Sequence, residues 1–121
     1  MPPPGFTPNS IHAHELTAPV YEALEQAARV GRKPQSGMWK RFQTAVGMLR
    51  HDGQWGEVIP PDDVPEYFRA RYHATNLYCI DLSPTTRCFY MVADREVIFL
   101  DIVDHEEYDK WFPPKGRRKR R

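Results

Sequence analysis

Residues 76–104 read NLYCIDLSPTTRCFYMVADREVIFLDIVD and contain three short runs rich in aromatic and β-branched side chains. The runs are Asn76–Ser83, Arg87–Ala93 and Glu96–Asp104, separated by Pro84-Thr85-Thr86 and by Asp94-Arg95. Runs of this kind, bounded by turn residues, are typical of β-strands. Because such short connections join antiparallel neighbours, the stretch predicts a three-stranded antiparallel meander.

The residues before the meander carry two helical patterns. Apolar residues recur at helical spacing over residues 18–30, where Thr17 suits an N-cap and Pro19 suits the first turn. After a break at residues 31–37, a second apolar stripe runs from Met38 to Leu49. Two helices that are each apolar on one side and joined by a short polar loop predict a helical hairpin laid on a sheet.

Three weaker signals complete the predicted fold. Residues 10–16 alternate as a short strand would, residues 53–75 are mainly loop with one helical turn around Glu66–Arg71, and a last helix covers His105–Phe112. The predicted order is β-α-α-β-β-β-α. This order predicts an α+β fold in which the helical hairpin packs on one face of a small antiparallel sheet and leaves the other face as a working surface.

The length of 121 residues suits one domain. We expect an irregular lead-in over residues 1–9, a single domain over 10–112 and a basic tail over 113–121. Without a long apolar run or a signal-peptide pattern, the sequence predicts a cytoplasmic protein with no membrane partner. Cys79 and Cys88 lie in apolar segments without a CxxC partner, which predicts buried, reduced thiols.

The net charge of +1 conceals a segregation of charge. Six of the 17 basic residues occupy the last seven positions, so the remaining 11 face all 16 acidic residues. The body is therefore acidic, whereas the tail is typical of a segment that binds polyanions. A tail that only aids solubility is the alternative.

Four segments in order carry a resemblance to a known family. They are GEVIP with VPEYF (56–60 and 64–68), NLYCIDL (76–82), TRCFYMV (86–92) and DHEEYDKWF (104–112). They resemble the loop after the helical hairpin, the "NLW-Y-DL" strand, the "WR-YTV" strand and the "DHKEYDKLF" ending of the RelE/ParE superfamily of toxins. The resemblance covers roughly residues 10–112, favours the RelE-like mRNA interferase subgroup, and implies a RelE/ParE-like fold.

The resemblance implies a toxin of a type II toxin-antitoxin system, held in check by a cognate antitoxin protein in a hetero-oligomer. Its expected activity is a ribosome-associated mRNA endoribonuclease in which the ribose 2′-hydroxyl attacks the adjacent phosphate, without metal or cofactor. The family's catalytic arginine falls on Arg87, whose guanidinium can hold a phosphate by two parallel hydrogen bonds. His105 and Tyr108 occupy the place of the C-terminal catalytic pair, His105 as acid or base and Tyr108 as a stacking or donating group.

Each of these residues also has a structural interpretation. Arg87 at a strand start can pair with a nearby carboxylate. His105 follows Asp104 and can be a capping or surface residue, and Tyr108 with Phe112 can simply anchor the last helix.

Further residues are predicted to contact RNA outside the catalytic group. Arg69, Arg71 and His73 can supply positive charge before the second strand of the family pattern, or they can be a solvated basic turn. The other predicted contacts are Arg95, Lys110, Lys115, Arg117 and Arg118. The strands and last helix carry fewer cations than the better-known ribonucleases of this type.

Two alternative functions therefore stay open. A ParE-like binding protein would inhibit DNA gyrase without cleaving RNA, and His105 would then be dispensable. A catalytically silent homologue would bind RNA or protein only. His12 and His14 have alternate-strand spacing but no third ligand signature, so no metal site is predicted.

Overall fold

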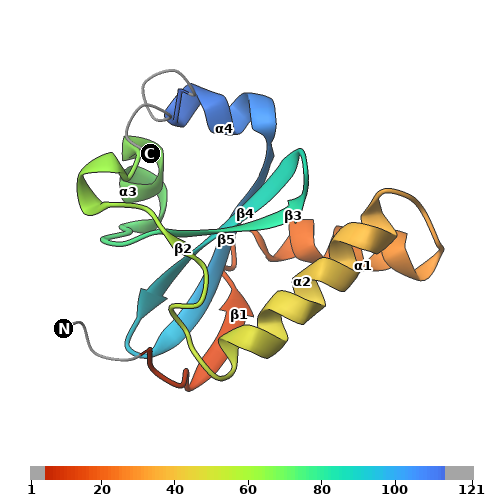
Figure 1. The fold of residues 1–121 in the computed structure, drawn as a ribbon, viewed down its shortest axis with the longest axis horizontal. Coiled ribbons are helices and arrows are strands. Elements are labelled where there is room, and N and C mark those ends of the chain that lie inside the picture. Colours follow the sequence, from red (N-terminus) through yellow and green to blue (C-terminus); the bar gives the residue numbers. More distant parts are fainter. Residues whose placement is uncertain (1–4, 114–121) are drawn as a thin grey trace.

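The computed structural model describes residues 5–113 and is built around one twisted sheet (Figure 1). Its elements are β1 (Ser10–Ala13), α1 (Ala18–Arg29), α2 (Gln35–Leu49), β2 (Glu57–Val58), a 3-10 turn (Pro61–Asp63), α3 (Glu66–Tyr72), β3 (Tyr78–Ser83), β4 (Thr86–Ala93), β5 (Glu96–Asp104) and α4 (His105–Trp111). The predicted α+β class is confirmed.

The predicted meander is confirmed. β3, β4 and β5 pair as antiparallel neighbours, with Asp81 opposite Arg87 and Cys88 opposite Ile102. The β4–β5 connection places Asp94 at φ 53° and Arg95 at φ 62°. Two left-handed residues in a row give the turn whose twist matches the flanking strands, so this two-residue connection closes a tight hairpin.

The sheet is mixed, and the prediction of a wholly antiparallel sheet is wrong. The strand order is β1-β5-β4-β3-β2, and β1 runs parallel to β5, with Ser10 opposite Glu96. Alternation of polar and apolar residues does not encode the direction of a strand, and no tight turn ties β1 to its neighbour. The two-residue strand β2, which pairs Glu57 with Cys79, was also not predicted, because it lies among glycines and prolines.

The helical hairpin covers one face of the sheet, as predicted, and its apolar side meets the even-numbered residues of β3 and β4. Phe42 of α2 is central to this core, with ring centroids 5.1 Å from Tyr21 and 4.8 Å from Phe99. Thr17 precedes α1 as expected but makes no side-chain cap. Its buried hydroxyl instead lies 3.2 Å from the His14 carbonyl oxygen and 3.0 Å from the Phe99 carbonyl oxygen and shares its single proton between them, which ties the start of α1 to β5.

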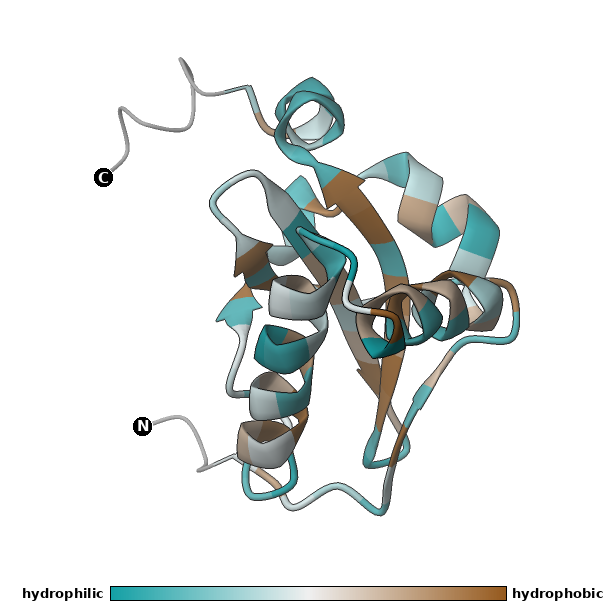
Figure 2. Ribbon diagram, turned by 90° about the vertical axis from the view of Figure 1, so that its right-hand side faces the viewer, coloured by the Kyte–Doolittle hydropathy of each residue, from teal (hydrophilic) through white to brown (hydrophobic). Residues whose placement is uncertain are grey.

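The other face is covered by α3 and α4, so the prediction of a free working face is wrong. Phe68 of α3 is fully buried and lies 4.9 Å from Phe89 and 5.0 Å from Trp111, measured between ring centroids. In Figure 1, α3 and α4 lie across the sheet from α1 and α2. Figure 2 shows apolar colour concentrated along the strands, which is expected of strands buried on both faces.

A β-bulge in β5 connects the two layers. Tyr90 pairs with Phe99 but Cys88 pairs with Ile102, so β5 carries one extra residue between these points. Tyr21 donates a hydrogen bond to the Leu100 carbonyl oxygen from the α1 side. Tyr67 and Tyr72 donate to the Asp101 carboxylate from the α3 side. The bulge therefore anchors a helix on each face.

Both cysteine thiols are buried and unpaired, as predicted. Burial raises the pKa of the Cys79 thiol from its ordinary value of 9.0 to about 12, and it raises the pKa of Cys88 well above that ordinary value. Among the described residues, no helix is long and apolar enough to cross a membrane.

These shifts predict a loss of stability in alkali. The unfolded chain releases thiol protons near pH 9, whereas the folded chain keeps the Cys79 proton up to about pH 12. The contribution is therefore fully present below about pH 9 and is lost as the pH rises through that window. We expect the melting temperature to fall between pH 9 and 11, and to fall less steeply in Cys79→Ala. At pH 8 the native thiols should resist a chromophoric disulfide reagent; rapid labelling of the folded protein would contradict their burial.

Candidate functional site

Arg87 is the second residue of β4 and faces the layer formed by α3 and α4. Its Nη1 donates to Asp81 Oδ1 at 3.1 Å, across the β3–β4 pair. Its guanidinium carbon lies 4.3 Å from the centroid of the Tyr108 ring. Arg87 is 24% exposed, so the guanidinium is held between a carboxylate and an aromatic face while one side remains open to solvent.

Tyr108 reaches Arg87 because α4 begins directly after β5. Asp104 caps this helix by accepting a hydrogen bond from the Glu107 N–H at 2.9 Å, and the chain turns back over the sheet. The Tyr108 ring also lies 6.2 Å from Phe89 and 4.8 Å from Phe112, measured between centroids. Tyr108 therefore anchors α4 and contacts the predicted catalytic arginine at the same time.

The phenol of Tyr108 is a hydrogen-bond donor at neutral pH. Burial raises its pKa above the ordinary value of 10.0, and the nearby guanidinium of Arg87 opposes this shift. A protonated phenol can donate to a phosphate oxygen or present its ring to a base, but it cannot accept a proton from a hydroxyl group.

His105 is the first residue of α4 and is exposed. Asp104 lies opposite Thr86, the residue before Arg87, so His105 begins one residue beyond the strand pair that holds Arg87. Asp104 supplies the side-chain cap, so the capping interpretation of His105 is not needed. Within residues 5–113 no side chain hydrogen-bonds or ion-pairs with His105, which leaves both ring nitrogens available to a ligand.

Two of the three predicted RNA contacts around α3 also make hydrogen bonds within the fold. Arg69 donates to the carbonyl oxygens of Val64 at 3.2 Å and Pro61 at 2.8 Å. Arg71 donates to the Tyr72 hydroxyl at 3.0 Å, and His73 ends α3 in the left-handed region at φ 57°. All three residues are exposed and lie in or directly after α3, so their role as RNA contacts stays a prediction.

The remaining predicted contacts are scattered. Arg95 lies beyond the end of β4 opposite to Arg87, where it donates to the Thr7 carbonyl oxygen at 3.0 Å. Lys110 is exposed and lies 3.5 Å from Glu107. Lys115, Arg117 and Arg118 lie outside the described residues. The structure thus brings Arg87 and Tyr108 into contact, whereas His105, also among the described residues, begins α4 after the Thr86–Asp104 pair and makes no hydrogen bond or ring contact with either of them.

Sequence reasoning missed two carboxylates near Arg87. Asp81 is its ion-pair partner, and Glu57 lies opposite Cys79, on the same side of the sheet as Asp81. The turn alone did not identify Asp81, because a regular ladder counted from the Ser83–Thr86 pair would place Leu82 opposite Arg87. The register shift between Asp81 and Ser83 brings Asp81 there instead. Glu57 had no signal either, since β2 was not predicted.

Comparison with protein-family models, curated proteins and solved structures finds no match to this chain. The resemblance to RelE/ParE toxins therefore stays a prediction, carried by the motifs alone. Among the described residues, no group of three His, Cys, Asp or Glu side chains is placed to hold a metal ion.

Proposed function

We propose that this chain is a RelE/ParE-type toxin that cleaves mRNA at the ribosome without a metal. The observation that supports this proposal best is the Arg87 guanidinium, which is stacked on Tyr108 and partly open to solvent; the same helix, α4, begins with the exposed His105. A cation, a hydrogen-bond donor and an imidazole are the groups that 2′-hydroxyl attack on a phosphate requires.

In this mechanism each residue has one task. The 2′-oxygen forms a bond to phosphorus and the bond to the 5′-oxygen of the next nucleotide breaks, leaving a 2′,3′-cyclic phosphate and a 5′-hydroxyl. Arg87 stabilises the charge that develops on the phosphorane oxygens. His105 takes the proton of the 2′-hydroxyl as a base and, as the imidazolium, returns it to the leaving 5′-oxygen. Tyr108 donates a hydrogen bond or stacks on a displaced base.

The proposal includes a protein partner. A toxin of this type needs a cognate antitoxin that covers the Arg87 region and forms a hetero-oligomer with it. The carboxylate of Asp81 offsets the positive charge of the Arg87 guanidinium. In the complex, an antitoxin carboxylate could take the place of Asp81 and bind the same guanidinium.

A second candidate function is binding without cleavage, as in the gyrase-inhibiting members of the superfamily. It is favoured by the acidic surroundings of Arg87, where Asp81 is in contact and Glu57 lies on the same side of the sheet. Carboxylates near a phosphate would oppose its approach. Under this alternative, Arg87 and Asp81 form a structural pair and His105 has no role.

Induced expression in a bacterial host with mapping of mRNA 5′ ends tests the proposal. We expect wild type to arrest growth and to create new 5′-hydroxyl ends inside coding regions, and His105→Ala to reduce their number by about 10²-fold, the usual contribution of an acid or base. Growth arrest without new ends would favour the binding alternative. The matched control is His51→Ala, an exposed histidine just after α2.

A further inference from the structure

A basic segment lies within the acidic body. Between Glu25 and Asp52 the chain has six basic residues and no acidic residue: Arg29, Arg32, Lys33, Lys40, Arg41 and Arg50. This segment forms the end of α1, the connecting loop and α2. More than half of the 11 basic residues outside the tail are therefore gathered on the helical hairpin, away from Arg87.

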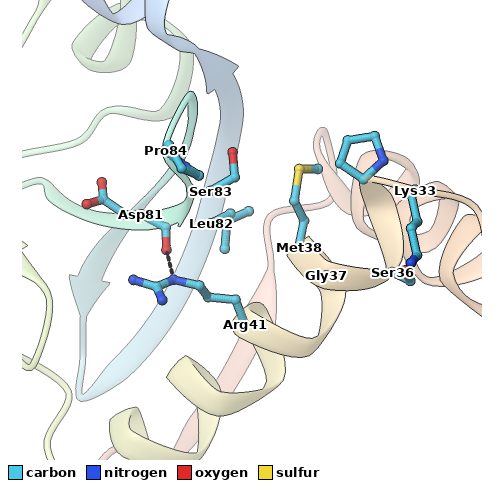
Figure 3. Close-up of a pocket in the computed structure, with 10 residues that line it drawn as sticks. Lys33, Ser36, Gly37, Met38, Arg41, Asp81, Leu82, Ser83 and Pro84 are labelled. Atoms are coloured by element: carbon cyan, nitrogen blue, oxygen red, sulfur yellow. Dashed lines mark hydrogen bonds between the residues drawn. The ribbon is translucent and has the colours of Figure 1, made fainter.

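Three of these cations border a groove along β3. One hollow of about 730 Å³ is lined by Lys33, Met38 and Arg41 on the helical side and by residues 81–84 on the sheet side (Figure 3). A second hollow of about 640 Å³ is lined by Lys40, Arg41 and Thr44 and by residues 55–57 and 79–81. Gly37, Arg41 and Asp81 line both hollows, so the two are neighbours and meet at the Arg41–Asp81 contact.

The groove exists because β3 has an open edge. β2 pairs only with Tyr78 and Cys79, and the rest of β3 has no strand on that side among the described residues. Arg41 reaches across from α2, and its Nε donates to the Asp81 carbonyl oxygen at 2.9 Å, as Figure 3 shows. The Asp81 carboxylate meanwhile holds Arg87. Asp81 thus connects the groove to the candidate site.

Trp55 supplies a different kind of contact. It is 43% exposed and lines the second hollow beside Lys40 and Arg41. The other two tryptophans pack against phenylalanine rings, Trp39 on Phe42 and Trp111 on Phe68, whereas no described ring stacks on Trp55. An exposed indole between cations combines a surface for base stacking with charges for phosphates, which is how single strands are bound without sequence preference.

We propose that this groove, bounded by Lys33, Lys40, Arg41 and Trp55, binds single-stranded RNA, with phosphates on the three cations and one base on the indole. Binding of RNA in the groove does not depend on the proposed function; only the statement that the bound RNA is also the substrate rests on it. A strand lying in the groove passes Asp81 and continues onto Arg87. Asp81 and Glu57 also line the groove, so the three cations and the indole must supply the affinity that these carboxylates oppose, while Arg87 acts on one phosphate of the bound strand.

The test is binding of the full chain to a short fluorescent RNA whose 2′-positions are methylated, so that it cannot be cleaved. Fluorescence anisotropy gives Kd at several salt concentrations. For the triple variant Lys33→Gln, Lys40→Gln, Arg41→Gln we expect affinity to fall by at least tenfold and the salt slope to fall by about 2, at roughly 0.7 per lost phosphate contact. Trp55→Ala should weaken binding about tenfold and Trp55→Phe much less, because a phenyl ring still stacks.

The matched control is Arg29→Gln, Arg32→Gln, Arg50→Gln. It removes the same charge from the same helical hairpin, but these residues line neither hollow of the groove. We expect its affinity to stay close to that of wild type. If both triple variants lose the same affinity for RNA, the groove proposal is overturned, because the binding then depends on the total charge of the hairpin and not on the groove. Circular dichroism and melting curves check that each variant is folded.

The outcomes separate the groove from the ribonuclease proposal. If the groove variants lose binding while wild type cleaves no RNA, the groove stands and the proposed activity falls. If wild type cleaves RNA through Arg87 while the groove variants bind as tightly as wild type, the activity stands and the groove is overturned. If wild type binds no RNA, the groove is also overturned.

Discussion

Arg87→Ala is expected to lower the rate of RNA cleavage by about 10²- to 10³-fold, the usual cost of removing one preorganised donor to the developing charge. The loss should appear in the cleavage step rather than in binding, because the groove along β3 supplies most phosphate contacts. Single-turnover cleavage of a labelled RNA by purified protein measures the first quantity, and anisotropy with uncleavable RNA measures the second.

Arg95→Ala is the matched control for Arg87. Both arginines belong to the β3–β5 meander, but Arg95 lies in the turn after β4 and bonds the Thr7 carbonyl oxygen. Its loss should change cleavage by less than about threefold. If the Arg87→Ala protein cleaves RNA as fast as wild type, Arg87 has no catalytic role and its ion pair with Asp81 is only structural. Arg87→Lys should recover little activity, since an ammonium group cannot form the paired hydrogen bonds of a guanidinium.

Phe68→Ala is expected to destabilise the protein by about 3–5 kcal/mol, the usual cost of truncating a fully buried phenylalanine. Phe68 is 0% exposed, and its ring contacts Phe89 of the sheet and Trp111 of α4. Since the free energy of unfolding of a small domain is only about 5–15 kcal/mol, this single change removes a large part of it. Urea denaturation followed by tryptophan fluorescence measures it.

Phe68→Leu provides the comparison, because it keeps most of the buried volume and should cost less than about 1.5 kcal/mol. If Phe68→Ala instead melts close to wild type, α3 does not contribute to the core as its burial indicates. A partial effect on RNA cleavage should accompany the loss of stability. α4 packs against Phe68 through Trp111, and α4 is the element that carries Tyr108 to Arg87.

Local patterns predicted the parts of the fold that local interactions determine. The three runs of the meander and the helical pattern of residues 105–112 were sufficient to place β3, β4, β5 and α4. The direction of β1 depends on a partner far along the chain, so alternation could not reveal it. The helical turn at Glu66–Arg71 and the last helix were expected, but their packing on the second face of the sheet was missed, because this packing is a tertiary property and the surrounding glycines and prolines read as a loop.

The candidate site was predictable in composition but not in geometry. The motifs located Arg87, His105 and Tyr108, and strand alternation fixes the face on which Arg87 lies. The position of the guanidinium over the Tyr108 ring depends on how α4 packs, which is a tertiary property. The basic segment 26–51 was visible as a charge pattern, but its connection to Arg87 through Asp81 required the open edge of β3.

The parallel pairing of β1 with β5 has a consequence for how the protein is made. Because Ser10 pairs with Glu96, the first strand leaves the ribosome long before its partner. The α1–α2 hairpin also cannot complete its packing until β5 has been synthesised, since Phe42 packs on Phe99. Contacts this distant in sequence form slowly, and domains fold as units. The nascent chain therefore acquires its Arg87 site only when β5 and α4 have emerged, so under the proposed function an incomplete chain could not cleave the message from which it is being translated.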